Sequence, residues 1–215
     1  MKSKAKGGKM QLREALSDIA QIRSLLDRNQ AYRGFRSIAI GISAVFVLMG
    51  SLVQLSADLA HSPSRYLDIW LCVALGSLMV TAVEMIVRGR KSNDTSVWKM
   101  HGKLAISILP CFVVGALLTA TLVLDSKNPM HLVRDNLWLL PGSWALIYSL
   151  GLFACCNLLH RTTRIAAIYY LLAGCTYLLC NWKTHQISAW HMVAIFGVGQ
   201  LVLAAILYWK VERHG

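Results

Sequence analysis

The sequence predicts an all-α polytopic membrane protein in which six transmembrane helices follow a cytoplasmic amphipathic helix. Hydrophobic residues make up 56% of the 215 residues, and charged residues only 15%. The apolar residues stand in continuous blocks that do not alternate with polar ones, which argues against membrane-spanning strands. These blocks are close to the roughly twenty residues that a helix needs to cross a bilayer core of about 30 Å.

Six apolar blocks reach or approach this length. The predicted spans are 37–57, 67–87, 104–124, 137–159, 165–180 and 188–208. Together they form a transmembrane domain over residues 37–210, followed by a short cytoplasmic tail at 211–215. The fifth block is the shortest, so we expect it to tilt little or to be flanked by interfacial side chains.

The positions of the basic residues predict the orientation. Eighteen of the 22 Lys and Arg residues precede the first span, follow the sixth, or lie between spans two and three or four and five. Because positive residues are retained on the cytoplasmic side, both termini are predicted to be cytoplasmic, with six crossings between them. The net charge of +12 then reflects topology and anionic headgroups, and we do not expect nucleic-acid binding.

The residues before the first span divide into two segments. Residues 1–9 predict a disordered basic tail. Residues 10–36 predict a cytoplasmic helix, because apolar side chains recur there at intervals of three and four. The apolar positions are Leu12, Ala15, Ile19, Ile22 and Leu26. This face either lies in the inner headgroup layer or pairs with a protein partner through residues 10–30. It covers fewer than three heptads, which favours the headgroup layer or the protein's own loops.

Local signals indicate the ends and shapes of the spans. Pro110 falls inside the third block, where we expect it to bend the helix, and Ser188 is the predicted N-cap of the sixth. The connection 88–103 is the longest on the cytoplasmic side, with room for a brief helical turn. Aromatic belts are expected at both boundaries. The predicted outer belt comprises Trp70, Trp138, Trp182 and Trp190, and the inner one Tyr32, Trp98, Tyr208 and Trp209.

Three polar residues inside the spans suggest an intramembrane site. Glu84 is the one acidic residue well inside a span, and an intramembrane carboxylate is costly enough to suggest function. Arg88 follows four residues later, however, at the spacing of a helical ion pair. An interfacial Glu84–Arg88 pair is therefore favoured, and a proton or cation site facing the bundle is the alternative. Asn157 and Gln200 stand in apolar surroundings, where hydrogen bonds between helices are expected.

Histidines and cysteines give weaker signals. His61, His131, His185 and His191 are all predicted on the outer side, where four imidazoles would suit a metal or haem. They come from separate loops without paired spacing or acidic neighbours, which favours solvated histidines. The six cysteines lie inside the predicted spans, so disulfides are not expected. Without a metalloprotease, hydrolase or P-loop motif, we expect no catalytic residue, cofactor or metal.

Three runs of the sequence resemble a group of bacterial inner-membrane proteins of similar length. The runs are IRSLLDRNQAYRGFRS, LLPGSWALIYSLGLFACC and FGVGQLVLAAILYW. The members of this group are uncharacterised multi-span proteins. The resemblance implies a bacterial inner-membrane location and six helices, and it carries over no catalytic or binding residues.

The sequence favours a non-enzymatic accessory or regulatory role, with residues 10–30 contacting a partner or the inner leaflet. This follows because the one sizeable segment outside the spans is amphipathic, while the spans contain few ionisable groups. Two alternatives stay open. One is a carrier for a small solute or ion with a site near Glu84, Asn157 and Gln200. The other is a membrane redox protein that uses the outer histidines.

Overall fold

The computed structural model describes Ile19, 37–56, 63–92, 95–124, 136–156, Leu158, 162–185 and 187–209. Every regular element in these ranges is helical, so the predicted all-α class is confirmed. The amphipathic helix predicted over residues 10–36 and both predicted tails lie outside the described residues, apart from Ile19. Those predictions are therefore untested.

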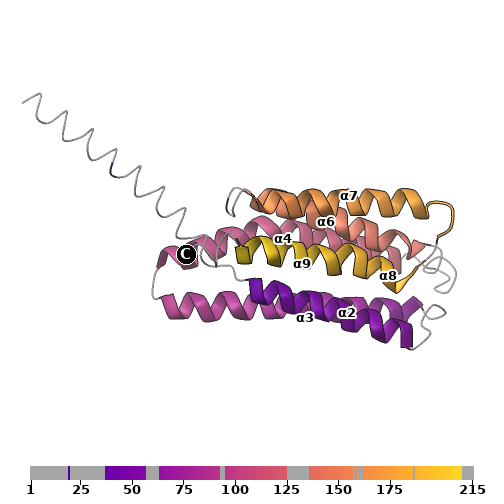
Figure 1. The fold of residues 1–215 in the computed structure, drawn as a ribbon, viewed down its shortest axis with the longest axis horizontal. Helices are drawn as coiled ribbons and strands as arrows, with labels where there is room; N and C mark the ends of the chain where they lie inside the picture. Colours follow the sequence, from indigo (N-terminus) through magenta and orange to yellow (C-terminus); the bar gives the residue numbers. More distant parts are fainter. Residues whose placement is uncertain are drawn as a thin grey trace, which may run out of the picture.

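The described elements run nearly antiparallel to one another as long rods (Figure 1). They are α2 (Ser37–Ser56), α3 (Pro63–Ser92), α4 (Thr95–Leu124), α6 (Leu139–Cys155), α7 (Thr163–Asn181), α8 (Ala189–Met192), η3 (Val193–Gly197) and α9 (Val198–Leu207). The last three follow one another without a break, so they form a single helix interrupted by one π-helical turn. As predicted, the Ser188 side chain caps this helix by accepting a hydrogen bond from the Trp190 backbone N–H at 3.4 Å.

Five of the described helices are long and apolar enough to cross a membrane. These stretches are Ser37–Ser56, Arg65–Lys91, His101–Leu122, Thr163–Asn181 and Ala189–Leu207. The lengths of the fourth and fifth predicted spans were wrong. The fourth, predicted over 137–159, is the 17-residue helix α6, whereas the fifth, predicted to be short, is the 19-residue helix α7. Helix α6 ends early because the Leu158 N–H bonds to the Cys155 carbonyl in a tight turn.

The helices form a ring in the order α3, α2, α9, α7, α6, α4. The closest association is between α6 and α7, and small residues explain it. A Cβ on Gly174 would lie 3.0 Å from the Gly142 carbonyl oxygen, and the Ser149 hydroxyl donates to the Ala167 carbonyl at 2.8 Å. Small residues let transmembrane helices approach closely. The weakest contact in the ring is between α3 and α4, which are buried over only 6% of their apolar stretches.

Helices α3 and α4 are much longer than their neighbours. Each has 30 residues, or about 45 Å at 1.5 Å per residue, against 17 to 20 residues in α2, α6 and α7. Figure 1 shows the joined ends of α3 and α4 extending past the other helices. The connection 88–103, predicted to hold only a brief helical turn, is helical except at 93–94, which are not described. Helix α4 also continues through Pro110 without a break.

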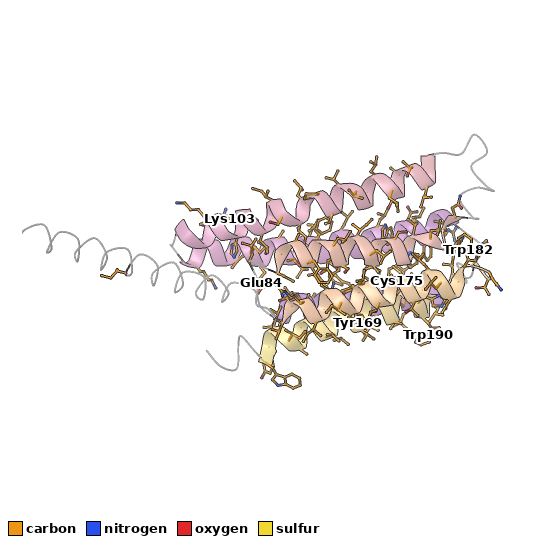
Figure 2. All side chains as sticks on the ribbon, turned by 90° about the horizontal axis from the view of Figure 1, so that it is seen from above. Glu84, Lys103, Tyr169, Cys175, Trp182 and Trp190 are labelled. Carbon is orange, nitrogen blue, oxygen red and sulfur yellow. The ribbon has the colours of Figure 1, made fainter. Side chains whose placement is uncertain are left out.

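We call the end of the bundle with the α3–α4 connection the basic end, and the opposite end the α8 end. Arg90, Lys91, Lys99 and Lys103 are exposed at the basic end. Figure 2 shows Glu84 and Lys103 toward this end, and Trp182 and Trp190 at the other. The two ends therefore differ in chemistry, the first cationic and the second aromatic.

Candidate functional site

The residues of the predicted intramembrane polar site lie on different parts of the ring. Gln200, half-buried on α9, forms a side-chain hydrogen bond with Tyr148 of α6. Glu84 is half-buried on α3, whose main neighbours are α2 and α4, whereas α9 packs mainly on α2 and α7. Asn157 lies outside the described residues, as does the side chain of Arg88. The Gln200 bond is of the helix-to-helix kind that the sequence suggested, and the Glu84–Arg88 pair stays a prediction.

The histidines at the α8 end contact aromatic rings. His185 stacks on Trp138 with ring centroids 4.7 Å apart, and His191 meets the Tyr177 ring edge-on at 4.9 Å. His61 and His131 are not among the described residues. Within the described part of the chain, no three His, Cys, Asp or Glu side chains gather closely enough to hold a metal ion.

Two of the four tryptophans predicted for the outer belt instead face the protein interior. Trp70 is only 2% exposed and Trp138 only 4%, whereas Trp182 and Trp190 are exposed over about two thirds of their surface, at 68% and 65%. The belt prediction was therefore wrong for Trp70 and Trp138. For Trp70 a buried partner accounts for this, because an indole N–H that leaves water must find an acceptor.

That acceptor is Gln54 of α2, which sequence reasoning missed. The Trp70 indole N–H donates to the Gln54 side-chain oxygen at 3.0 Å. Gln54 is itself buried. A lone amide in an otherwise apolar block was the signal that could have found it, since such a group is costly to bury without a partner.

A cluster of two buried tyrosines and a partly buried histidine lies beside this pair at the α8 end. We call Tyr66, Tyr177 and His191 the Tyr–His cluster; they come from α3, α7 and α8. Tyr66 is close enough to Tyr177 for the two side chains to interact electrostatically, and Tyr177 contacts the His191 ring. The Tyr66 hydroxyl and His191 Nδ1 are both buried without a hydrogen-bond partner in the described structure.

Apolar residues surround the Tyr–His cluster. Tyr66 belongs to a core whose other buried members are Val47, Leu67, Trp70, Leu137, Leu140 and Met192. The Ser188 cap begins α8 and so places His191 in its first turn, facing Tyr177. One turn further along α7, the Asn181 side-chain amide donates to the Tyr177 carbonyl at 3.1 Å. The cluster is therefore a small set of neutral hydrogen-bonding groups in an apolar wall.

A second aromatic cluster lies deeper, around the π-helical turn. The Tyr169 hydroxyl donates to the Ala194 carbonyl within that turn. Tyr170 is fully buried, and its ring fills the space beside Gly199, where a Cβ would lie 2.6 Å from the hydroxyl oxygen. A π-turn accommodates one extra residue in a helix and is often found at functional sites. Here a carbonyl within the π-turn accepts a hydrogen bond from α7.

No family model, curated protein or solved structure matches the chain. The class that the fold itself defines is a helical protein with several apolar helices of membrane-spanning length. The resemblance to bacterial inner-membrane proteins is neither supported nor opposed by these comparisons.

Proposed function

We propose that the protein is a non-enzymatic accessory or regulatory protein of a bacterial inner membrane, with six crossings and cytoplasmic termini. In this proposal the projecting ends of α3 and α4 bind the anionic headgroups of the inner leaflet. The observation that carries it is the pairing of unusual helix length with exposed positive charge at the basic end.

Helical arithmetic supports a position of these charges near the headgroups. About twenty residues cross the hydrocarbon core. The apolar stretch of α3 begins at Arg65, so the helix would leave the core near Glu84. Arg90 and Lys91 then lie roughly 8–10 Å further on, in or just past a headgroup layer about 5–8 Å thick. Lys99 and Lys103 return through the same layer on α4. Each Lys or Arg near such a surface contributes about 1 kcal/mol of attraction.

A tryptophan joins the two projecting helix ends. Gly89 of α3 is buried under the Trp98 ring of α4, where a Cβ would lie 2.7 Å from Trp98 Cε2. The outer part of the indole stays exposed. Amphipathic rings favour the membrane boundary, so Trp98 suits both roles: it holds the tip together and anchors it among headgroups.

Lipid retention in mixed nanodiscs of phosphatidylglycerol and phosphatidylcholine tests this proposal. Replacing one Arg and one Lys at the basic end (Arg90→Gln with Lys99→Gln) should weaken phosphatidylglycerol binding by about tenfold or more, given about 1 kcal/mol per charge. The matched control, Arg65→Gln with Lys183→Gln, also removes one exposed Arg and one exposed Lys, but at the α8 end. It should leave phosphatidylglycerol binding unchanged. Equal losses from both pairs would reject the proposal.

The amphipathic segment 10–30 is proposed as a second contact with the inner leaflet or a partner. Deleting residues 1–30 should then reduce partner capture without preventing membrane insertion. The carrier and redox alternatives remain separately testable. Glu84→Gln should abolish solute uptake or proton coupling in vesicles if the protein is a carrier, and a haem or copper spectrum should accompany the purified protein if it is a redox protein.

A further inference from the structure

Two buried polar atoms of the Tyr–His cluster call for a hydrogen-bond partner. The Tyr66 hydroxyl and His191 Nδ1 are buried without hydrogen-bond partners. Burying such a group unpaired costs about 1–3 kcal/mol, and nearly all buried polar groups in proteins have a protein or water partner. Tyr66 interacts electrostatically with Tyr177, whose ring contacts His191, and Tyr66 shares a core with Met192, the residue after His191. One shared partner for the two atoms is therefore the economical explanation.

We propose that the Tyr–His cluster holds an ordered internal water molecule that bridges Tyr66 of α3 to His191 of α8 beside Tyr177 of α7. A buried water usually has two to four polar partners. The phenol can donate and accept, and the neutral imidazole offers either an acceptor or a donor at Nδ1. Water, which does both, satisfies each group whichever tautomer His191 adopts.

The surroundings argue for a small neutral ligand. The buried side chains packed with Tyr66 are aliphatic, thioether or indole groups, and an ion placed there would lose its hydration without a countercharge. Trp70 does not compete for the ligand, because its N–H is already bonded to Gln54. The Tyr170 hydroxyl is also buried without a hydrogen-bond partner, but it belongs to the separate aromatic cluster around the π-helical turn, where its ring is packed against Gly199.

The water would join three helices that are far apart in the sequence. Helices α3 and α7 are not neighbours in the ring, and α8 begins the last helix. A bridge from Tyr66 to His191 would therefore join α3 to the far side of the α8 end, whereas its main neighbours are α2 and α4. This inference is independent of headgroup binding at the basic end.

The direction in which Tyr66→Phe changes the Tm tests whether the water is present. If the Tyr66 hydroxyl is hydrated, Tyr66→Phe loses a bond and leaves its partner unsatisfied, so the Tm should fall by about 2–4 °C. If the hydroxyl is truly unpaired, removing it relieves a cost and the Tm rises. Two control variants set the scale of the Tm change. Tyr148→Phe loses the bond to Gln200 and should lower the Tm, whereas Tyr208→Phe alters an exposed side chain and should leave the Tm unchanged. A rise or no change for Tyr66→Phe would overturn the proposal.

Radiolytic hydroxyl labelling of the unaltered protein in nanodiscs gives a second measurement that does not depend on a variant folding. Radicals generated from a bound water oxidise the side chains that touch it. Tyr66 should therefore be labelled several-fold faster than Tyr148, whose hydroxyl is already bonded to Gln200. Equal protection of the two tyrosines would show that no water is present.

Discussion

Trp70 and Gln54 are joined by a 3.0 Å hydrogen bond inside an apolar wall, and this bond fastens α3 to α2. The same face of α2 is close to α3 at Gly50, where a Cβ would lie 2.7 Å from Val73 Cγ2. Because α2 is the helix that α3 contacts most, this stretch contributes to holding α3 in place.

Removing the acceptor should therefore be costly. Gln54→Met keeps the volume but leaves the buried Trp70 N–H unpaired, and we expect a loss of about 1–3 kcal/mol in the free energy of unfolding. Adding Trp70→Phe should recover part of this loss, because the orphaned donor is then gone. Chemical unfolding in detergent measures both. Additive losses in the double variant would show that the bond does not couple the two helices.

Gly199 should resist enlargement. Its Cβ would lie 2.6 Å from the Tyr170 hydroxyl oxygen and 2.8 Å from Cε1 of the same ring, and overpacking of this kind costs about 1–3 kcal/mol. Gly199→Ala should lower the Tm accordingly. Gly102→Ala is the matched control, because a Cβ there meets nothing within 4 Å. Similar Tm values for the two variants would mean that α7 and α9 are not packed as described.

The tip of the α3–α4 hairpin should depend on Gly89. An alanine would place its Cβ 2.7 Å from Trp98 Cε2 and should displace the indole. We expect Gly89→Ala to raise the accessibility of Trp98 to a water-soluble quencher. Comparison of this variant with the unaltered chain, in a background where the other tryptophans are replaced by phenylalanine, isolates the signal. Unchanged quenching would remove the role of Trp98 in joining the two ends.

The proposal of six crossings requires α6 to cross the membrane. If this 17-residue helix crosses the membrane, single cysteines at Asn136 and Thr162, placed in a cysteine-free background, should react with an impermeant maleimide from opposite sides. Thr162→Cys should be labelled from the cytoplasmic side, together with Lys99→Cys. Labelling of Asn136→Cys and Thr162→Cys from one side would leave five crossings and place the two termini on opposite sides.

Sequence patterns predicted the helices better than they predicted the contacts between them. Continuous apolar blocks and the Ser188 cap identified the helical segments. Both signals can be found within one segment, because the length of an apolar block and the capping of a helix end do not depend on distant residues. The length of α6 was overestimated, because hydropathy alone could not detect the turn after Cys155. The helical continuation of α3 and α4 past the core was missed for the opposite reason, since polar sequence there was taken for a loop.

The sequence by itself determined that the described chain is helical and rich in apolar helices of membrane-spanning length, and it separated a basic end from an aromatic one. Those properties depend on composition within single segments. Only the tertiary structure decided that Trp70 turns inward to Gln54, that Gly199 leaves room for Tyr170, and that the Tyr177 ring meets His191. Which side chains pair depends on the rotation and order of the helices around the ring, and a hydropathy pattern in which every face is apolar contains little information about that rotation.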